Sequence, residues 1–190
     1  MRKLLLSFVV VCGLTAPAGA VPIVYSGTLA NGVPVTGVNN QTAANESNPV
    51  GAVYYSFFAT AGSSVNIFGD RLSGHYDMSF WVFRGTYADT TDFGSSFPGA
   101  QGANFIAFGD DQDPPNIPGP FGDPNVTFTA PVTGFYTVAV TNFLSNAGPP
   151  NPFSLQANGV ANAPEPATLT VFGVLAVGAF GVRRRLKASA

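Results

Sequence analysis

Apolar and polar residues alternate with a period of two along several short stretches of the chain. The clearest stretch is Phe135–Asn142, in which tyrosine and valine alternate with threonine and alanine. Successive side chains of a strand point to opposite faces, so this pattern predicts a β-strand. Similar stretches, rich in β-branched and aromatic residues and separated by turn residues, predict strands at 23–29, 53–59, 65–67, 78–84, 105–108, 126–129 and 153–156.

Two of these stretches carry large side chains on both faces. In 53–59 the alternation places Tyr55 and Phe57 opposite Tyr54, and in 78–84 it places Trp81 opposite Phe80. Because strands that are apolar on both faces are buried on both, we expect Trp81 in the core rather than on the surface as a platform for sugar rings.

Seven or eight short strands without helical patterns predict an all-β protein, folded as an antiparallel β-sandwich. An up-and-down barrel is the alternative. The segments 31–49, which is Asn-rich and polar, and 110–124, which is rich in proline, are predicted to be long surface loops.

The N-terminus has the three parts of a secretory signal peptide. Two basic residues precede an apolar run, Leu4–Leu14, and Ala18-Gly19-Ala20 supplies an A-x-A cleavage site. Residues 1–20 are therefore predicted to direct secretion by the Sec route, with cleavage after Ala20.

The C-terminus also has three parts. Pro164-Glu165-Pro166 precedes an uncharged apolar run, 167–182, which is predicted to be a transmembrane helix, and a basic tail, 183–187, which is predicted to stop transfer. The basic residues of this tail are Arg183, Arg184, Arg185 and Lys187. At about 1.5 Å per residue the run spans roughly 24 Å, less than the ~30 Å hydrocarbon core, which suits brief retention better than a permanent anchor.

This tail, residues 164–190, resembles the PEP-CTERM sorting signal of bacterial surface proteins. The resemblance implies that an exosortase, a membrane-embedded transpeptidase, recognises Pro164, Glu165 and Pro166. It further implies that the protein is held at the membrane through the tail and then delivered to the cell surface or extracellular matrix. A plain transmembrane anchor is the alternative.

Between the two targeting segments lie a predicted domain, 21–158, and a short linker, 159–163. The domain carries nine acidic residues against two arginines, Arg71 and Arg84, which gives a formal charge of −7. Such a charge disfavours nucleic acid as a partner. The domain has no cysteine and therefore forms no disulfide.

Within the domain, about 53–142 resembles the bacterial pre-peptidase C-terminal (PPC) domain. The matching pieces are Tyr55–Gly62, Val65–Ile67, Asp77–Phe83, Ile106–Asp111 and Phe128–Val138, and the last holds an apolar-x-Ala-Pro-x-x-Gly-x-Tyr pattern. The resemblance implies a jelly-roll-like β-sandwich of the kind that serves as an accessory domain in secreted proteins, where some members bind calcium or polymeric substrates.

The sequence Asp110-Asp111-x-Asp113 is the best candidate for chemistry. Calcium takes six to eight oxygen ligands, which carboxylates clustered in one loop supply. The PPC resemblance places Asp77 at a strand entrance that faces this loop. We therefore expect Asp77, Asp110, Asp111 and Asp113 to be candidate calcium ligands, with a solvated acidic turn as the alternative.

No catalytic residue is predicted, and we expect the protein not to be an enzyme. Ser73, His75 and Asp77 are close in the chain, but a triad is defined by geometry rather than by nearness in sequence. The function predicted is a structural or adhesive role in an exopolysaccharide-rich matrix. The alternative is a calcium-dependent carbohydrate-binding module, and extracellular polysaccharide is the predicted partner in either case.

Overall fold

The computed structural model describes residues 20–41, 46–94, 96–97, 104–145 and 149–163. The predicted signal peptide, its cleavage residue Ala18 and the tail 164–190 lie outside these ranges, apart from Ala20. The described residues form nine strands and a short 3-10 helix, η1. The elements are β1 (Tyr25–Thr28), β2 (Val35–Asn39), β3 (Val53–Ala59), β4 (Ser64–Arg71), β5 (Tyr76–Arg84), η1 (Thr90–Phe93), β6 (Phe105–Gly109), β7 (Asn125–Thr129), β8 (Gly134–Ser145) and β9 (Asn151–Asn158).

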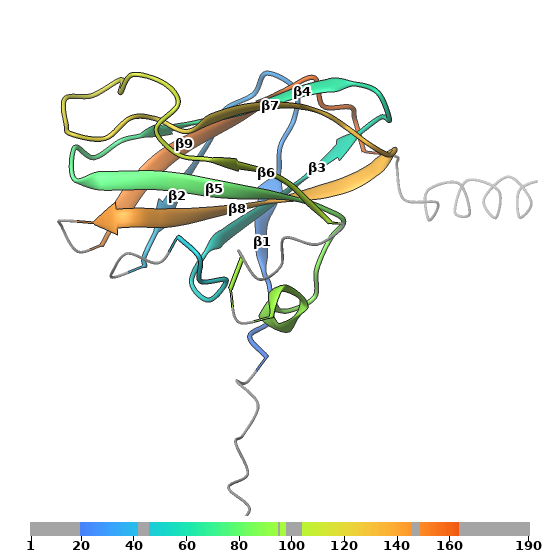
Figure 1. Ribbon diagram of the computed structural model, residues 1–190, viewed down its shortest axis with the longest axis horizontal. Helices are drawn as coiled ribbons and strands as arrows, with labels where there is room; N and C mark the ends of the chain where they lie inside the picture. The colour runs from blue at the N-terminus through green and yellow to red at the C-terminus, as the bar shows by residue number, and fades with distance from the viewer. Residues whose placement is uncertain (1–19, 42–45, 95, 98–103, 146–148, 164–190) are drawn as a thin grey trace, which may run out of the picture.

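The strands form two sheets that pack face to face (Figure 1). One sheet has the order β1-β3-β8-β5-β6 and the other has the order β2-β9-β4-β7. Strand pairs are antiparallel, except that β1 pairs with β3 in parallel. The predicted all-β sandwich is thereby confirmed.

The main core lies between the two sheets. Phe57, Phe80 and Val138 from the five-stranded sheet meet Ile67 and Leu155 from the other, and all five are fully buried. The period of two in the sequence is responsible, because it places every second side chain of each strand on the inner face. The face assignments predicted for β3 and β5 are confirmed.

A second apolar cluster covers the outer face of the five-stranded sheet. Trp81 and Phe83 of β5 pack there against Phe93 of η1 and against Phe97, and Tyr54 of β3 completes the cluster. Asp89 caps η1, because its carboxylate accepts a hydrogen bond from the backbone N–H of Thr91 at 2.8 Å. β3 and β5 are therefore buried on both faces over most of their length, which explains why both faces of these two strands carry large apolar side chains.

The prediction of one loop over 31–49 is wrong, because β2 lies within it and pairs with β9. Gly37 at the centre of β2 explains the error. A Cβ at this position would lie 2.5 Å from Cζ of Phe153 and 2.7 Å from the hydroxyl oxygen of Tyr55. Glycine, which in sequence indicates a turn, is required here by two aromatic side chains that approach the strand closely.

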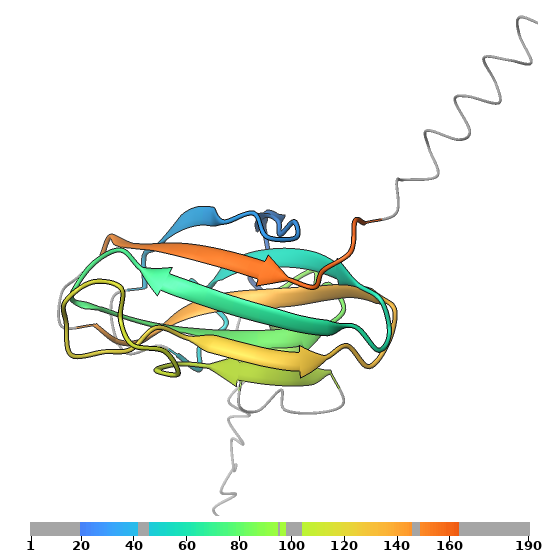
Figure 2. The ribbon, with the colours of Figure 1, turned by 90° about the horizontal axis from the view of Figure 1, so that it is seen from above.

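The segment 110–124 is a long loop between β6 and β7, as predicted. It lies at one end of the sandwich, whereas β9 leads to residues 159–163 at the opposite end (Figure 2). Residues 159–161 of the segment predicted as a linker are packed against the sandwich, since Val160 is 7% exposed and belongs to the main core. Asn162 and Ala163, which follow, are exposed.

Candidate metal site on the loop between β6 and β7

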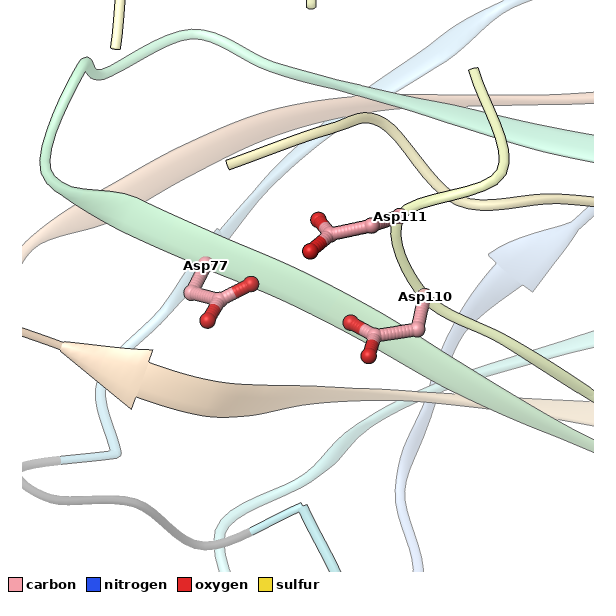
Figure 3. A group of neighbouring side chains, drawn as sticks. All are labelled: Asp77, Asp110 and Asp111. Carbon is pink, nitrogen blue, oxygen red and sulfur yellow. The ribbon is translucent and has the colours of Figure 1, made fainter. Parts of the chain in front are cut away.

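Three carboxylates converge where β5 meets the start of the β6–β7 loop. One oxygen each from Asp77, Asp110 and Asp111 lies within 4.8 Å of the others. Figure 3 shows the three side chains directed toward a common space, with Asp77 on β5 and the two others on the loop. The structure thus brings together residues that are more than thirty positions apart in the chain.

An irregularity in the sheet lies at Asp77. The pairing of β5 with β8 shifts in register between Tyr76 and Met78, so Asp77 lies at this break. Such irregularities bend a strand and change the direction of a side chain. Asp77 is 2% exposed, although the ends of strands commonly expose their carboxylates to water.

Local hydrogen bonds fix the backbone at Asp110 and the carboxylate of Asp111. Asp110 directly follows β6, and its backbone N–H donates to Oε1 of Gln112 at 2.7 Å. Oδ1 of Asp111 accepts the backbone N–H of Gly122 at 2.6 Å. A Cβ on Gly122 would lie 2.9 Å from Cα of Asp111, so glycine allows this close approach. Asp111 itself is exposed, which leaves one side of the group open to solvent.

The electrostatics of the group disfavour three negative charges. Burial raises the pKa of Asp110 to about 6, and the negative charges of Asp111 and Glu46 act in the same direction. Oδ1 of Asp110 is buried and accepts no hydrogen bond among the described residues. A carboxylate in such surroundings is stabilised either by a proton or by a cation.

Glu46 is a fourth acidic residue near this group that the sequence did not indicate. The indole N–H of Trp81 donates to its backbone oxygen at 2.7 Å, which ties the segment before β3 to the sheet. Burial also raises the pKa of the Glu46 carboxyl. Nothing in the spacing could have found this residue, because more than sixty positions separate it from Asp110.

Asp113 does not join the group. Its backbone forms a bridge with Asp123, with hydrogen bonds of 2.9 and 2.8 Å, and its carboxylate accepts Nδ2 of Asn125 at 2.6 Å. We call this bridge between Asp113 and Asp123 the neck of the loop. Asp110 and Asp111 precede it in the chain. Of the four candidate ligands, the structure therefore gathers three.

The other aspartate of this neck, Asp123, has a positive partner. Asp123 is 2% exposed, and its Oδ1 lies 3.7 Å from Nε of the fully buried Arg71. The same oxygen accepts the backbone N–H of Arg71 at 3.1 Å, and Oδ2 accepts that of Asn116 at 2.9 Å. Arg71 also donates to the carbonyl of Ile117 at 3.1 Å and lies over the ring of Phe121. Arg71 thereby fixes the outer part of the loop.

Other candidate residues have simpler surroundings. Trp81 is 4% exposed and is stacked among phenylalanines, so its predicted place in the core is confirmed. His75 is exposed, whereas Asp77 is buried.

The donor set is made of oxygen atoms only. Carboxylate oxygens suit hard cations such as calcium, which accept irregular geometry and several water ligands. Both arginines of the domain have partners elsewhere, since Arg71 pairs with Asp123 and Arg84 donates to Oδ1 of Asn104. A divalent cation therefore fits the charge and the chemistry of Asp77, Asp110 and Asp111.

Comparison with known proteins identifies the C-terminal tail. Residues 162–185 match the PEP-CTERM protein-sorting motif. The chain carries a PEP-CTERM sorting motif. This motif implies a secreted, exosortase-processed protein of the cell surface or extracellular space, as the sequence predicted. Within the described residues no helix has the length and apolar character needed to cross a bilayer, and the predicted transmembrane helix 167–182 lies outside them.

Solved structures similar to this chain come from several kinds of protein. A surface-associated copper-binding protein of Methylomicrobium album BG8, CorA, is 15% identical with a TM-score of 0.49, over 70% of this chain and 98% of that one. The pre-peptidase C-terminal domain of a Bacillus anthracis collagenase is 12% identical with a TM-score of 0.42, over 72% of this chain and 98% of that one. Aeromonas hydrophila PliG, a periplasmic inhibitor of g-type lysozyme, is 21% identical with a TM-score of 0.41, over 71% of this chain and 96% of that one. No curated protein matches the chain.

Proposed function

We propose that this protein is a calcium-binding, non-catalytic structural or adhesive component of an exopolysaccharide-rich surface matrix. The observation that carries the proposal is the convergence of Asp77, Asp110 and Asp111, whose oxygens lie within 4.8 Å of one another. The sorting motif at 162–185 supports the location, because it implies a surface or extracellular protein.

The charge of this group favours a cation. With its pKa raised to about 6, Asp110 loses its proton near neutral pH and then lies beside Asp111 as a second negative charge. Like charges at such distances repel strongly when water is partly excluded. A calcium ion reverses the sign of the interaction, and its remaining ligand positions are filled by backbone carbonyls and water.

The open side of this group favours a matrix role. Asp111 is exposed, so an ion bound there keeps coordination positions that face the solvent. Acidic polysaccharides carry carboxylates that fill such positions, so calcium would join the protein to the polymer. The net charge of −7 for residues 21–158 would otherwise repel an anionic polymer, which makes the ion essential to this contact.

Calorimetry of the purified protein tests the calcium site. We expect a saturable heat when Ca²⁺ is added at pH 7.5 and a much weaker one with Mg²⁺, which demands a more regular octahedral geometry. Asp111→Asn should remove most of the heat. Asp113→Asn is the matched control, because this residue lies on the same loop outside the group. Equal heats for the two variants would count against the site.

The matrix role has a separate test in the native host. Deletion of the gene for this protein should weaken cell adhesion and lower the amount of matrix retained on the cell surface. Expression of the Asp111→Asn variant in the deletion strain should restore adhesion and matrix only in part. Unchanged adhesion and matrix after deletion would reject the role.

The carbohydrate-binding module stays the second candidate. It requires a saturable site for a sugar of defined length, whereas bridging by calcium gives weak binding that grows with polymer charge. The buried position of Trp81 disfavours stacking on a sugar ring at this residue. Titration of neutral oligosaccharides, with and without a chelator, separates the two: saturation by a neutral sugar would favour the module.

We also infer that the apolar run 167–182 retains the protein at the membrane until the sorting motif is processed. Mass spectrometry of both termini, in membrane and released fractions, tests this. We expect a start at Val21 and an end near Pro164-Glu165-Pro166 in the released fraction. A tail intact to Ala190 in all fractions would indicate a permanent anchor.

A further inference from the structure

The residues just before the sorting motif are fixed to the sandwich. We call residues 159–161 the strap. The backbone N–H of Gly159 donates to Oδ1 of Asn31 at 2.7 Å, and the N–H of Ala161 donates to the carbonyl of Phe58 at 2.8 Å. Between them Val160 is 7% exposed and packs into the main core.

The backbone of Gly159 adds to this attachment. Its φ is +75°, and a Cβ at this position would lie 2.0 Å from the carbonyl oxygen of Ser64. Only glycine combines this dihedral with this approach, so the turn from β9 into the strap depends on it. The strap is thus held by packing, by two hydrogen bonds and by a glycine turn.

The strap lies very close to the motif in the sequence. Pro164 follows Ala161 by three residues, and a fully extended chain of three residues spans at most about 11 Å. A peptidase binds its substrate in an extended form, with several residues on each side of the cleaved bond in its groove. The two exposed residues Asn162 and Ala163 are too few to carry the motif into such a groove while the sandwich end stays outside it.

We propose that the strap detaches from the sandwich before the sorting enzyme acts, so that its packing sets the rate of processing. The inference rests on the sorting that the motif implies, and it is independent of calcium. Local opening that exposes a cleavage site is common, and cleavage then follows the population of the open form when opening is fast. The folded domain thereby delays the release of its own tail.

The experiment compares the parent chain with five variants, one of them Glu165→Ala, in the native host by pulse labelling, with the fraction that retains the tail measured over time. In Val160→Ala the loss of buried methyl groups should increase processing about five-fold. A spacer of six glycine and serine residues between Ala163 and Pro164 should increase it at least as much. Combined with this spacer, Val160→Ala should have no further effect. Val132→Ala is the matched control, because Val132 is 38% exposed and lies outside the strap.

The outcomes separate the strap inference from the sorting on which it rests. If the parent chain is processed but Val160→Ala and the spacer leave its rate unchanged, the strap inference is wrong and the sorting stands. Glu165→Ala, which alters the sorting motif, is the unprocessed reference. If the parent retains its tail as fully as this variant, the protein is not processed at the motif, and the strap inference is then wrong as well.

Hydrogen exchange of the purified full chain gives a second measurement, independent of the host. The N–H of Ala161 should exchange at least ten-fold faster than that of Val138 at the centre of β8, because the strap opens without the sandwich. Val160→Ala should accelerate exchange at Ala161 by about the same factor as processing in the host. Equal exchange at both residues would mean that the strap opens only when the whole domain unfolds, which would overturn the inference.

Discussion

The loop between β6 and β7 carries two acidic groups that differ in how their charge is balanced. At the neck of the loop, the carboxylate of Asp123 lies beside the buried Arg71 and accepts two backbone N–H groups. Before the neck, Asp110 and Asp111 lie with Asp77, and both arginines of the domain are engaged elsewhere. The first group is balanced within the chain, and we infer that the second requires an ion from outside.

The contrast also separates two kinds of function for an aspartate. A buried carboxylate with a fixed positive partner organises the chain, but it is not available to a ligand. A carboxylate that faces other carboxylates raises the energy of the folded protein and is relieved when a cation binds. The loop thus combines a part that holds its shape with a part suited to binding.

The largest effect should come from removal of the buried positive charge. Arg71→Met leaves the buried Asp123 without its partner and releases Ile117, so the free energy of unfolding should fall by about 3 kcal/mol. Urea unfolding measures it. Arg84→Met, which removes a partly exposed arginine, is the control and should cost less than about 1 kcal/mol. Similar losses in both variants would mean that Arg71 does not organise the loop.

The second effect is stabilisation by calcium. At a free Ca²⁺ concentration one hundred times the Kd, the free energy of unfolding should rise by about 2.7 kcal/mol, because only the folded protein gathers Asp77 with Asp110 and Asp111. Thermal unfolding with Ca²⁺ and with a chelator measures the difference. Asp77→Asn should abolish the rise. A rise that persists in this variant would place the ion elsewhere.

The third effect is the pH dependence of the protein without calcium. The pKa of Asp110 is raised from its ordinary value of 3.8 to about 6, so the folded state binds this proton more tightly than the unfolded state. The contribution of Asp110 to stability is therefore most favourable below pH 4 and is lost as the pH rises toward 6. Asp110→Asn should stabilise the calcium-free protein at pH 7 by about 1 kcal/mol, a value reduced for partial contact with water.

Urea unfolding at several pH values between 4 and 7, in the presence of a chelator, measures this effect. The difference between the parent and Asp110→Asn should grow over that range. A constant difference would show that Asp110 titrates as an ordinary exposed carboxyl. The same variant should lose calcium binding, so that one substitution raises stability and removes the proposed function.

The smallest effect is expected at Asp113, which the sequence included among the ligands and the structure places apart. Asp113→Asn should change the free energy of unfolding by less than about 1 kcal/mol, since one exposed hydrogen bond to Asn125 is altered. Its calcium affinity should equal that of the parent in calorimetry. A ten-fold loss of affinity would instead restore Asp113 to the set of ligands.

Much of the fold follows from local patterns in the chain. The alternation in 53–59, 78–84 and 135–142 predicted the central strands and their faces, because the side-chain period of a strand is independent of its neighbours. The strand 35–39 could not be predicted in this way. Its central Gly37 is explained only by Phe153 and Tyr55, which come from distant parts of the chain.

The candidate site follows from sequence only in part. Asp110 and Asp111 are adjacent, and acidic residues in one loop indicate a cation by their chemistry alone. Glu46 and the exclusion of Asp113 depend on long-range placement, by the bond from Trp81 and by the bridge to Asp123. Spacing in the chain carries no information on either contact.

The sequence by itself determined the C-terminal sorting motif, the strand-rich composition and the acidity of the domain, and it predicts the N-terminal signal peptide. These properties depend on residue type and on short-range order, which a linear chain contains in full. Only the tertiary structure decided which carboxylates meet, which of them Arg71 neutralises, and that residues 159–161 are packed in place. Each of these depends on the pairing of strands far apart in the chain, and that pairing is set by the packing of the whole core.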